Sequence, residues 1–355
     1  MYHDHTIGVV IPAYNEEGFI GDVIRDMPAY VDRIFVVDDC SSDGTWEDVQ
    51  QAAREDSDND KITPSDVADR GRVAATDGGG SLGGRAVRHD MIGRVVPIKH
   101  DQNRGAGGAI KTGYLAARDD EMDITATVDG DGQMDLSQMS KLLDPLVEGD
   151  ADYAKGNRLL YKEYRSDMPK FRFIGNSILT FLTKIASGYW KTMDPQNGYT
   201  AISYHALDNV GVEQMYEYYG YCNDLLVKLN AKGMRVADVA IPAIYGEEES
   251  SISYTEYIRK VSWMLLKNFH WRLKVKYMVL DFHPLALFYA FGIITGTFGA
   301  LSAVWSIYAY LSFGESLFVR GSLSLMIFTM GSMFFMFAML FDMQVNESNE
   351  VQIRE

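Results

Sequence analysis

Short apolar runs alternate, over the first 130 residues, with stretches in which apolar residues recur at helical spacing. The first pattern is typical of buried strands and the second of amphipathic helices. Strands that alternate with helices predict an α/β fold with a mostly parallel, Rossmann-like sheet, whose ligand lies at the carboxyl ends of the strands. The predicted strands are residues 6–14, 33–39, 94–100 and 123–129, and the predicted helices are residues 16–27, 45–54 and about 105–118.

Residues 56–93 interrupt this alternation. They are rich in aspartate and contain the glycine-rich run GGGSLGG, with little apolar periodicity. A segment of this kind cannot bury enough apolar surface to fold alone, so we expect a disordered or surface insertion here.

The C-terminal part carries two uncharged stretches, residues 284–314 and 321–341, separated only by a short polar link. Each exceeds the roughly 20 apolar residues that a helix needs to cross a bilayer, so we expect a two-helix transmembrane hairpin over residues 282–341. A pair of buried core helices is the alternative. The preceding residues 254–281 are rich in lysine and arginine, which by the positive-inside rule predicts that the N-terminal part of this membrane protein is cytoplasmic.

Two further segments show apolar stripes at helical spacing beside basic residues, namely residues 170–190 and 254–281. A helix buried in a domain would show the same stripe, but beside a bilayer we expect interfacial helices. The chain is therefore divided into a catalytic domain, a basic juxtamembrane helix, the hairpin and a cytoplasmic tail, with the bounds 1–253, 254–281, 282–341 and 342–355.

Composition restricts the partners. The 355 residues include 33 lysines and arginines against 49 aspartates and glutamates, a formal net charge of -16. This balance argues against a nucleic-acid partner, because phosphate backbones attract an excess of lysine and arginine. It also fits a protein kept soluble in high salt. Two cysteines, Cys40 and Cys222, give neither a disulfide framework nor a metal-binding spacing, which indicates a reducing compartment.

The stretch ATVDGDGQMD places Asp129 and Asp131 directly after a predicted buried strand. The glycines between and after them allow the loop to fold so that both carboxylates face one divalent cation, which removes their repulsion. Carboxylate and amide oxygens, here with Gln133 as a third donor, suit Mg²⁺ or Mn²⁺. A solvated turn is the alternative, since Asp and Gly are ordinary turn residues.

The glycine-rich segment 103–113 is not a Walker loop, because Ile110 precedes Lys111 and Thr112 where that motif requires glycine. Its backbone N–H groups could hold phosphate at the start of a helix, or its glycines could allow close packing of helix on sheet.

Four segments in order, VVIPAYNEEGFI, FVVDDCSSDGT, HDQNRGAGGAIKTG and TVDGDGQMD, resemble the family 2 glycosyltransferases, which have the GT-A fold. The later segments YAKGNRL, MPKFRFIGNSILTFLTKIASG, MDPQNGYTAIS and YGYCNDLLVKLNAKG, together with the hairpin, resemble the polyprenyl-phosphate glycosyltransferases. This is the group of dolichyl-phosphate mannose synthase and dolichyl-phosphate glucosyltransferase, and the acidic composition suggests an archaeal, haloarchaeal member.

The resemblance implies roles for individual residues. It implies that Asp131 and Gln133 hold the metal, with Asp129 beside them. A solvated strand end is the alternative for Asp38. The residues implied to contact the nucleotide sugar are Pro12, Tyr14, Glu16, Val37, Asp38, Asp39, Asp129, Gly130 and Asp131.

A lipid monophosphate acceptor is largely dianionic at neutral pH and is already a nucleophile, so it needs no strong general base. What it needs is positive charge that holds two phosphate-bearing substrates together. The resemblance implies that Arg158 and Arg172, with Asn176 nearby, hold this phosphate, so that Asp131, Arg158 and Arg172 are the catalytic set. A surface ion pair is the alternative for Arg158, and a membrane-facing charge is the alternative for Arg172.

The expected activity is transfer of one hexose or N-acetylhexosamine from a nucleotide sugar to polyprenyl or dolichyl phosphate, with inversion. The segment DPQNGYT is closer to the glucosyltransferases than to the mannose synthases, which favours a UDP-sugar over GDP-mannose. A GDP-mannose-dependent synthase, a processive polysaccharide synthase and a non-catalytic nucleotide-sugar sensor are the alternatives.

Overall fold

The computed structural model describes residues 1–59, 82–159, 170–242 and 254–353. Within these residues, nine strands form one sheet in the order β3-β4-β2-β1-β5-β7-β6-β8-β9. The strands are β1 Ile7–Ala13, β2 Arg33–Asp38, β3 Ala86–Arg88, β4 Val95–His100, β5 Ile124–Thr127, β6 Tyr153–Asn157, β7 Thr200–Ser203, β8 Val236–Ala240 and β9 Glu350–Ile353.

The four strands predicted from the sequence are β1, β2, β4 and β5, and they pair with one another in parallel. Strand β7 runs antiparallel to both β5 and β6, so β6 points in the same direction as β5, and β8 and β9 are parallel to β6. The prediction of a mostly parallel sheet is confirmed. Its carboxyl edge gathers the ends of β1, β2, β4, β5 and β6 together with the start of β7.

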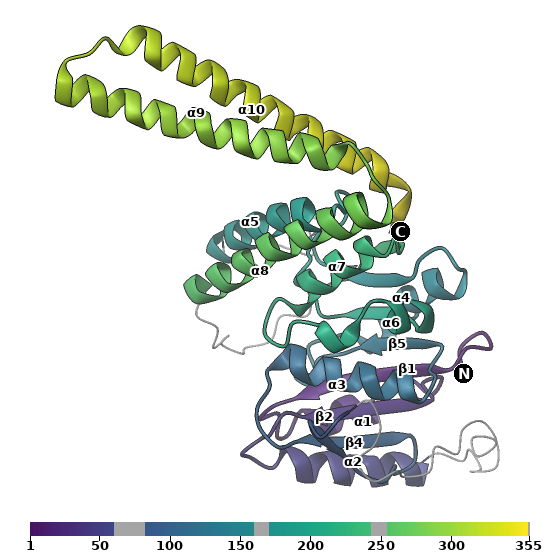
Figure 1. Cartoon of the computed structure of the whole chain (residues 1–355). Coiled ribbons are helices and arrows are strands. Elements are labelled where there is room, and N and C mark those ends of the chain that lie inside the picture. The colour runs from purple at the N-terminus through teal and green to yellow at the C-terminus, as the bar shows by residue number, and fades with distance from the viewer. Residues whose placement is uncertain (60–81, 160–169, 243–253, 354–355) are drawn as a thin grey trace.

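Helices cover both faces of the sheet, and two apolar clusters lie beneath them (Figure 1). One cluster joins the sheet to α1, α2 and α4, and the other joins it to α3, α6 and α7. Alternate residues of β1 enter opposite clusters, as the two-residue period of a strand requires: Val9 faces the first and Val10 the second. The helices are α1 Ile20–Arg25, α2 Thr45–Asn59, α3 Ala106–Asp119, α4 Met139–Val147, α6 Tyr204–Asn209 and α7 Tyr221–Ala231.

The glycine-rich segment packs helix on sheet. A side chain at Gly113 of α3 would meet Val10 of β1, and one at Gly107 would lie 2.6 Å from the carbonyl oxygen of Tyr216. Gly105, at the start of the helix, has φ +81°, a backbone conformation that favours glycine. Close packing therefore accounts for these glycines.

Five strands, β3, β6, β7, β8 and β9, were not predicted, and β3 and β9 lie in segments for which another structure was expected. The expected insertion over residues 56–93 begins inside α2 and contains β3, which pairs antiparallel with β4, while residues 60–81 lie outside the described residues. The expected tail over residues 342–355 contains β9, which extends the sheet beyond β8. The final residues thus return to the sheet after the apolar helices.

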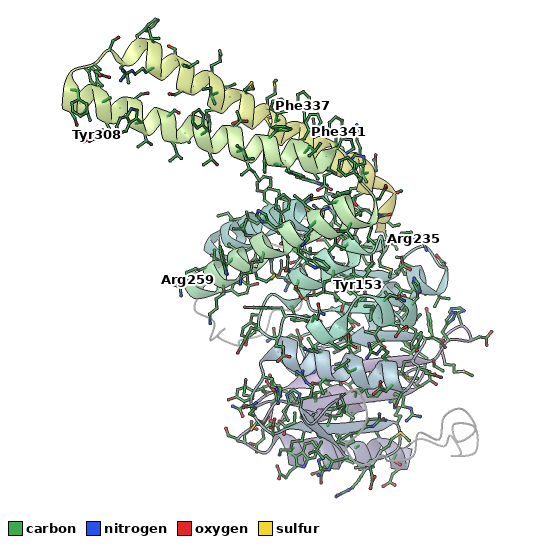
Figure 2. The ribbon with its side chains drawn as sticks, viewed as in Figure 1. Tyr153, Arg235, Arg259, Tyr308, Phe337 and Phe341 are labelled. Atoms are coloured by element: carbon green, nitrogen blue, oxygen red, sulfur yellow. The ribbon has the colours of Figure 1, made fainter. Side chains whose placement is uncertain are left out.

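Both uncharged stretches are helices, α9 Leu285–Phe313 and α10 Leu317–Asn346, and they form a hairpin that projects from the rest of the molecule (Figure 1). Both are long and apolar enough to cross a membrane. Their apolar side chains are largely exposed, including Tyr308, Phe337 and Phe341 in Figure 2. Glycines bring the two helices together: a side chain at Gly292 would lie 2.7 Å from the backbone of Phe335.

Helices α5 Lys170–Ser187 and α8 Tyr254–Lys274 lie between the hairpin and the sheet (Figure 1). Much of the apolar stripe predicted to face the membrane is instead buried where these helices pack on each other and on α7, as at Leu179, Val261 and Leu265. Other apolar residues remain exposed, notably Ile178 and Phe181 of α5 and Trp263 of α8. The stripe therefore combines packing positions with exposed positions.

A buried ion pair joins the hairpin to this helical layer. The Arg272 guanidinium on α8 donates to both carboxylate oxygens of Asp342 on α10, at 2.9 and 2.7 Å, and both side chains are fully buried. Arg272 also donates to the carbonyl oxygens of Ile185 and Ala186, at the end of α5. Asn346 of α10 completes the cluster by accepting from Asn230 of α7 at 2.8 Å.

Replacing Asp342 by asparagine should therefore destabilise the whole chain. Arg272 would keep its charge in a buried position without a counterion, which typically costs about 3–5 kcal/mol. Denaturant unfolding of purified protein in detergent measures this loss. Glu315→Gln, which removes an exposed partner of Arg320, is the matched control and should leave the unfolding midpoint unchanged. Equal stability of the two variants would contradict a structural role for the buried pair.

Candidate active site

The residues predicted to act on substrate follow strands that end at the carboxyl edge of the sheet. Asp129 follows β5 and Arg158 follows β6, while the segment before Thr200 enters the antiparallel strand β7 at the same edge. In open α/β sheets ligands bind outside the carboxyl ends of the strands. The sheet topology therefore brings the acidic loop and Arg158 to one edge, although the two lie far apart along the chain.

The acidic loop packs directly on the segment after β1. A side chain at Gly130 would lie 2.9 Å from the carbonyl oxygen of Pro12 and 3.6 Å from Cγ of Glu16. Only a residue without Cβ allows this approach. Within the loop, a carboxylate oxygen of Asp131 accepts the backbone N–H of Gln133 at 2.9 Å. The loop after β5, with Gly130, Asp131 and Gln133, thus lies next to Pro12 and Glu16 at the end of β1.

Asp129 lies deepest in this loop. A side chain at Gly198 would lie 3.0 Å from the Tyr221 hydroxyl and 3.4 Å from an Asp129 carboxylate oxygen, so these groups meet at the glycine. Burial and, to a smaller extent, the negative charge of Asp131 raise the pKa of Asp129 to about 7, against the opposing effect of the nearby Arg158 guanidinium. Two carboxylates and one guanidinium therefore share this edge.

Arg158 is held by a buried carboxylate that the sequence analysis did not identify. The guanidinium donates to both oxygens of Asp194, from Nε at 2.7 Å and from Nη2 at 3.0 Å, and the Arg158 backbone N–H donates at 3.2 Å. The Asp194 side chain is fully buried, whereas Arg158 keeps 22% of its side-chain surface exposed. Burial raises the pKa of Asp194, but the charge and hydrogen bonds of Arg158 outweigh it and hold that pKa below its usual range.

The ion pair fixes the direction of Arg158 while leaving part of it accessible. A bidentate contact restricts the guanidinium to one plane. Asp194 has φ +46°, which is uncommon for a residue with a side chain, so its position depends on the surrounding contacts. The surface ion pair considered as the alternative for Arg158 is instead a pair with a buried partner.

The end of β2 contributes three predicted residues in different environments. Val37 is buried in an apolar cluster, and its register places it beside Pro12. Asp38 is also buried; it accepts the backbone N–H of Ser41 at 2.9 Å and lies 3.4 Å from the Lys99 ammonium. It is therefore not the solvated strand end considered as its alternative.

Asp39 holds the segment that leads into α3. Its oxygens accept the backbone N–H groups of Arg104 and Gly105 at 2.8 and 2.7 Å, and one lies 2.5 Å from His100 Nδ1. His100 Nε2 in turn lies 2.8 Å from the hydroxyl of Thr112. Asp39 therefore has a structural role, because it fixes the backbone that leads into α3.

Three further predicted residues follow β1 or belong to α5. Tyr14 follows β1 and is 48% exposed. Asn176 is partly buried in α5. Arg172 belongs to the first turns of α5, but its side chain lies outside the described residues. In the part of the chain that the structure describes, no three or more histidine, cysteine or acidic side chains form a metal-binding group.

Sequence reasoning missed Asp194, Gly198 and Tyr221. They lie in the segments MDPQNGYTAIS and YGYCNDLLVKLNAKG, which were used only for their resemblance to a group of enzymes. An aspartate followed by proline and a glycine before a strand are ordinary loop signals. Their contacts with Arg158 and Asp129 depend on the antiparallel pairing of β7, which the sequence did not predict.

The class of protein follows from this fold and site. Residues 8–67 and 83–211 match the sequence model described as Glycosyl transferase family 2, so the chain belongs to that family. It is a glycosyltransferase with the GT-A fold, as the sequence analysis expected.

Among characterised relatives, the chain is similar to the UDP-N-acetylglucosamine--dolichyl-phosphate N-acetylglucosaminyltransferase of Methanococcus voltae. The two are 29% identical over 245 residues, which cover 69% of this chain and 88% of that protein. An uncharacterized protein of Methanocaldococcus jannaschii is 29% identical over 246 residues, covering 69% and 84%. The solved structure of glucosyl-3-phosphoglycerate synthase from Mycobacterium tuberculosis with uridine diphosphate aligns with a TM-score of 0.47 at 18% identity, covering 77% of this chain and 81% of that one.

Gly198→Ala tests the contact between the segment before β7 and the acidic loop. The added methyl group must displace the Tyr221 hydroxyl or the Asp129 carboxylate, and overpacking of this kind costs about 1–3 kcal/mol. We expect transferase activity to fall by roughly tenfold, because about 1.4 kcal/mol of lost transition-state stabilisation has this effect.

Gly321→Ala in α10 is the control, because the added methyl group would lie 3.6 and 3.7 Å from the nearest atoms, both in the Leu317 side chain. Initial rates of sugar transfer and thermal unfolding curves measure both variants. Full activity of Gly198→Ala would show that the segment does not lie against the acidic loop.

Proposed function

We propose that this protein transfers a single N-acetylglucosamine or closely related hexose from a UDP-sugar to dolichyl phosphate, with inversion at the anomeric carbon. The name of the Methanococcus voltae relative supports both substrates. The observation that carries the proposal is the position of the Arg158 guanidinium at the same sheet edge as the acidic loop: Asp129 follows β5 and Arg158 follows β6, and the guanidinium acts to lower the pKa of Asp129. One edge of the sheet thus offers carboxylates for a cation-bound diphosphate and a guanidinium for a second phosphate.

The proposed reaction needs no basic side chain. The lipid phosphate is largely dianionic at neutral pH, so its oxygen is already a nucleophile. A bond forms between that oxygen and the anomeric carbon, while the bond from this carbon to the β-phosphate oxygen breaks and UDP leaves with the electron pair. Arg158, directed by Asp194, would hold the acceptor phosphate against the repulsion of the donor diphosphate.

The remaining predicted residues complete this proposal. Arg172 and Asn176 of α5 would join Arg158 at the acceptor phosphate. The donor would lie over the ends of β1 and β2 and on the acidic loop, in contact with Pro12, Tyr14, Glu16, Val37, Asp38, Asp39, Asp129, Gly130 and Asp131.

Mg²⁺ or Mn²⁺ fits the acidic loop. Burial and the neighbouring Asp131 disfavour the charged form of Asp129, and a bound cation would reverse this effect. Asp131 and Gln133, with Asp129, would hold the ion through hard oxygen ligands. The ion would neutralise charge on the departing diphosphate.

The membrane arrangement is part of the proposal. We infer that α9 and α10 cross the membrane and that the domain of residues 1–253 lies on the cytoplasmic side. The basic residues of α8, among them Arg259 near its start, support this orientation (Figure 2). Exposed apolar residues on α5 and α8 would lie at the lipid interface, where the phosphate of dolichol is found.

A donor screen tests the function directly. Purified full-length protein in detergent is incubated with short-chain dolichyl phosphate and radiolabelled UDP-N-acetylglucosamine, UDP-glucose or GDP-mannose. We expect labelled lipid from a UDP-sugar only when the lipid phosphate is present. Labelled lipid only from GDP-mannose would replace the donor assignment, and a polymeric product would indicate a processive synthase.

Arg158→Ala should raise the acceptor KM while leaving donor binding nearly unchanged. A charge-assisted contact contributes about 1.5–3 kcal/mol, so a rise of roughly 10- to 100-fold is expected. Arg172→Ala should act in the same direction, and Arg172→Lys should recover only part of the loss, because an ammonium lacks the planar fork. Initial rates against dolichyl phosphate concentration give the acceptor KM. An unchanged KM in both alanine variants would leave the acceptor site without its proposed cations.

Asp131→Asn should remove a charged ligand of the cation and abolish most transfer. The residue is partly exposed in its loop, so the unfolding midpoint should stay close to that of the wild type. Isothermal titration of UDP with and without Mn²⁺ measures the effect, and EDTA should suppress wild-type turnover. Undiminished turnover in excess EDTA would contradict the metal assignment.

A further inference from the structure

The C-terminal strand β9 reaches the proposed site through one carboxylate. Glu350, the first residue of β9, is buried and accepts three successive backbone N–H groups: from Trp190 at 2.8 Å, Lys191 at 2.6 Å and Thr192 at 2.9 Å. The Thr192 hydroxyl also donates to it at 3.2 Å. Three N–H groups converging on one carboxylate form a strong, directional contact.

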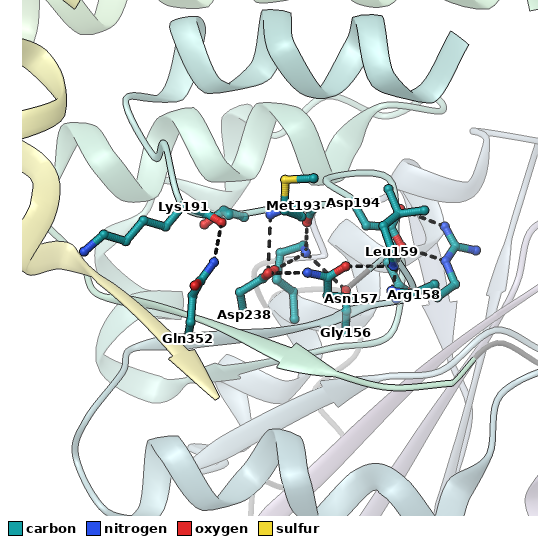
Figure 3. Close-up of polar contacts among 12 residues, drawn as sticks. Gly156, Asn157, Arg158, Leu159, Lys191, Met193, Asp194, Asp238 and Gln352 are labelled. Carbon is teal, nitrogen blue, oxygen red and sulfur yellow. Dashed lines mark hydrogen bonds and ion pairs between the residues drawn. The ribbon is translucent and has the colours of Figure 1, made fainter. Parts of the chain in front are cut away.

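The residues bound by Glu350 begin a segment that crosses the sheet towards the carboxyl edge. This crossing segment, residues 190–198, runs from Glu350 at the start of β9 to Gly198 beside Asp129. Figure 3 shows its middle part, with Lys191, Met193 and Asp194. Gln352 of β9 adds a second contact, since its amide donates to the carbonyl oxygen of Lys191 at 2.8 Å.

The middle of the crossing segment is fixed by strands β6 and β8. The Met193 carbonyl accepts from the Lys155 ammonium, and the Met193 N–H donates to Asp238 at 3.4 Å. Lys155 and Asp238 form an ion pair of 2.8 Å in which both side chains are almost fully buried. The next residue is Asp194, which holds the Arg158 guanidinium in two hydrogen bonds.

We propose that Glu350 is a positioning residue for the transfer reaction, which fixes residues 190–194 and through them directs Arg158 towards the acceptor phosphate. The inference rests on the proposed role of Arg158. Glu350 itself lies at the opposite end of the crossing segment and touches no substrate. Asp194, with its positive φ, depends on constraints on both sides, and on the N-terminal side Glu350 adds to the contacts that Lys155 and Asp238 make with Met193.

This arrangement gives the C-terminal residues a functional reason to return to the sheet. A short link, Glu347–Asn349, is all that separates β9 from α10, and Arg272 and Asp342 fix the base of α10 to the helical layer. The hairpin and the proposed acceptor-binding cation are therefore connected through one strand. A lipid phosphate that is held in the membrane by its chain would thus bind Arg158, and the position of Arg158 would depend on the hairpin of α9 and α10.

Glu350→Gln in the full-length protein tests the proposal. The variant keeps the size of the side chain but offers one acceptor oxygen to three N–H donors. We expect the acceptor KM for dolichyl phosphate to rise about tenfold, below the roughly 100-fold loss that a misplacement of about 1 Å can cause. The KM for the UDP-sugar and the affinity for UDP should stay within about twofold, because the donor contacts lie on other strands.

Glu347→Gln is the matched control. Glu347 lies three residues before Glu350 and also contacts Lys191. Its carboxylate, however, lies 3.1 Å from the Lys191 ammonium rather than at the backbone, and both side chains are well exposed. The same chemical change should therefore leave both KM values unchanged. Glu350→Asp, which keeps the charge, should recover part of the loss.

A double-mutant cycle separates this inference from the proposed function. In an Arg158→Ala background, Glu350→Gln should change the acceptor KM by less than about twofold, because the residue through which it acts is gone. Full additivity, or an unchanged acceptor KM in Glu350→Gln, would overturn the positioning role while leaving the function intact. No effect of Arg158→Ala alone would instead refute the proposed acceptor site.

If Glu350→Gln loses UDP binding and thus its fold, Gln352→Ala carries the test through the exposed contact with Lys191. Its acceptor KM should then rise about threefold, a smaller effect than that of a charged group. Equal rates for Gln352→Ala and the wild type across the acceptor titration would overturn the proposal.

Discussion

The buried carboxylate of Asp194 determines where the Arg158 guanidinium lies in the candidate site. Asp194 is fully enclosed, and such a group stays charged only if a partner compensates for the water it has lost. Arg158 supplies that compensation through both carboxylate oxygens, and in exchange its guanidinium takes a single direction. The constraint matters in a chain of net charge -16, where the attraction of phosphate depends on a few well-placed cations. The loop geometry around Asp194 and the strands beneath it all contribute to this one direction.

A second buried pair fixes the base of the apolar hairpin. Arg272 and Asp342 are both fully buried and join α8 to α10. Between the two pairs lie β9 and the crossing segment, in which each of residues 190–193 is held by a hydrogen bond from its backbone N–H. The sheet, the helical layer and the hairpin therefore form one connected body, and the proposed site sits at the sheet edge whose loops this connection orders. A transferase that acts on a lipid phosphate benefits from such a connection, because its acceptor is fixed to the bilayer.

Features that depend on neighbouring residues could be predicted from the sequence, whereas contacts between residues far apart along the chain could not. Strands β1, β2, β4 and β5 are apolar runs with a clear period, and the carboxyl-edge rule then gathers Pro12, Glu16 and Asp129. Strand β9 is four residues long with a charged start, and nothing in its composition indicates that it pairs with β8. Asp194 and Glu350 are single acidic residues whose partners are 36 and about 160 positions away. The helical stripes of α5 and α8 gave the right elements, yet period alone does not tell a neighbouring helix from lipid, so Leu179 and Val261 proved to be packing residues.

The anomeric configuration of the lipid-linked product tests whether Arg158 and the acidic loop hold the two phosphates for in-line attack. If Arg158 and the acidic loop hold the two phosphates so that the lipid phosphate oxygen attacks the anomeric carbon in line, an α-linked UDP-sugar must give a β-linked lipid phosphate and free UDP. Proton NMR of the purified product, with chromatography of the released nucleotide, determines both. We expect a β-linked sugar monophosphate and UDP. An α-linked product would require a second displacement, and release of UMP would require attack at phosphorus; either result would contradict in-line attack of the lipid phosphate at the anomeric carbon.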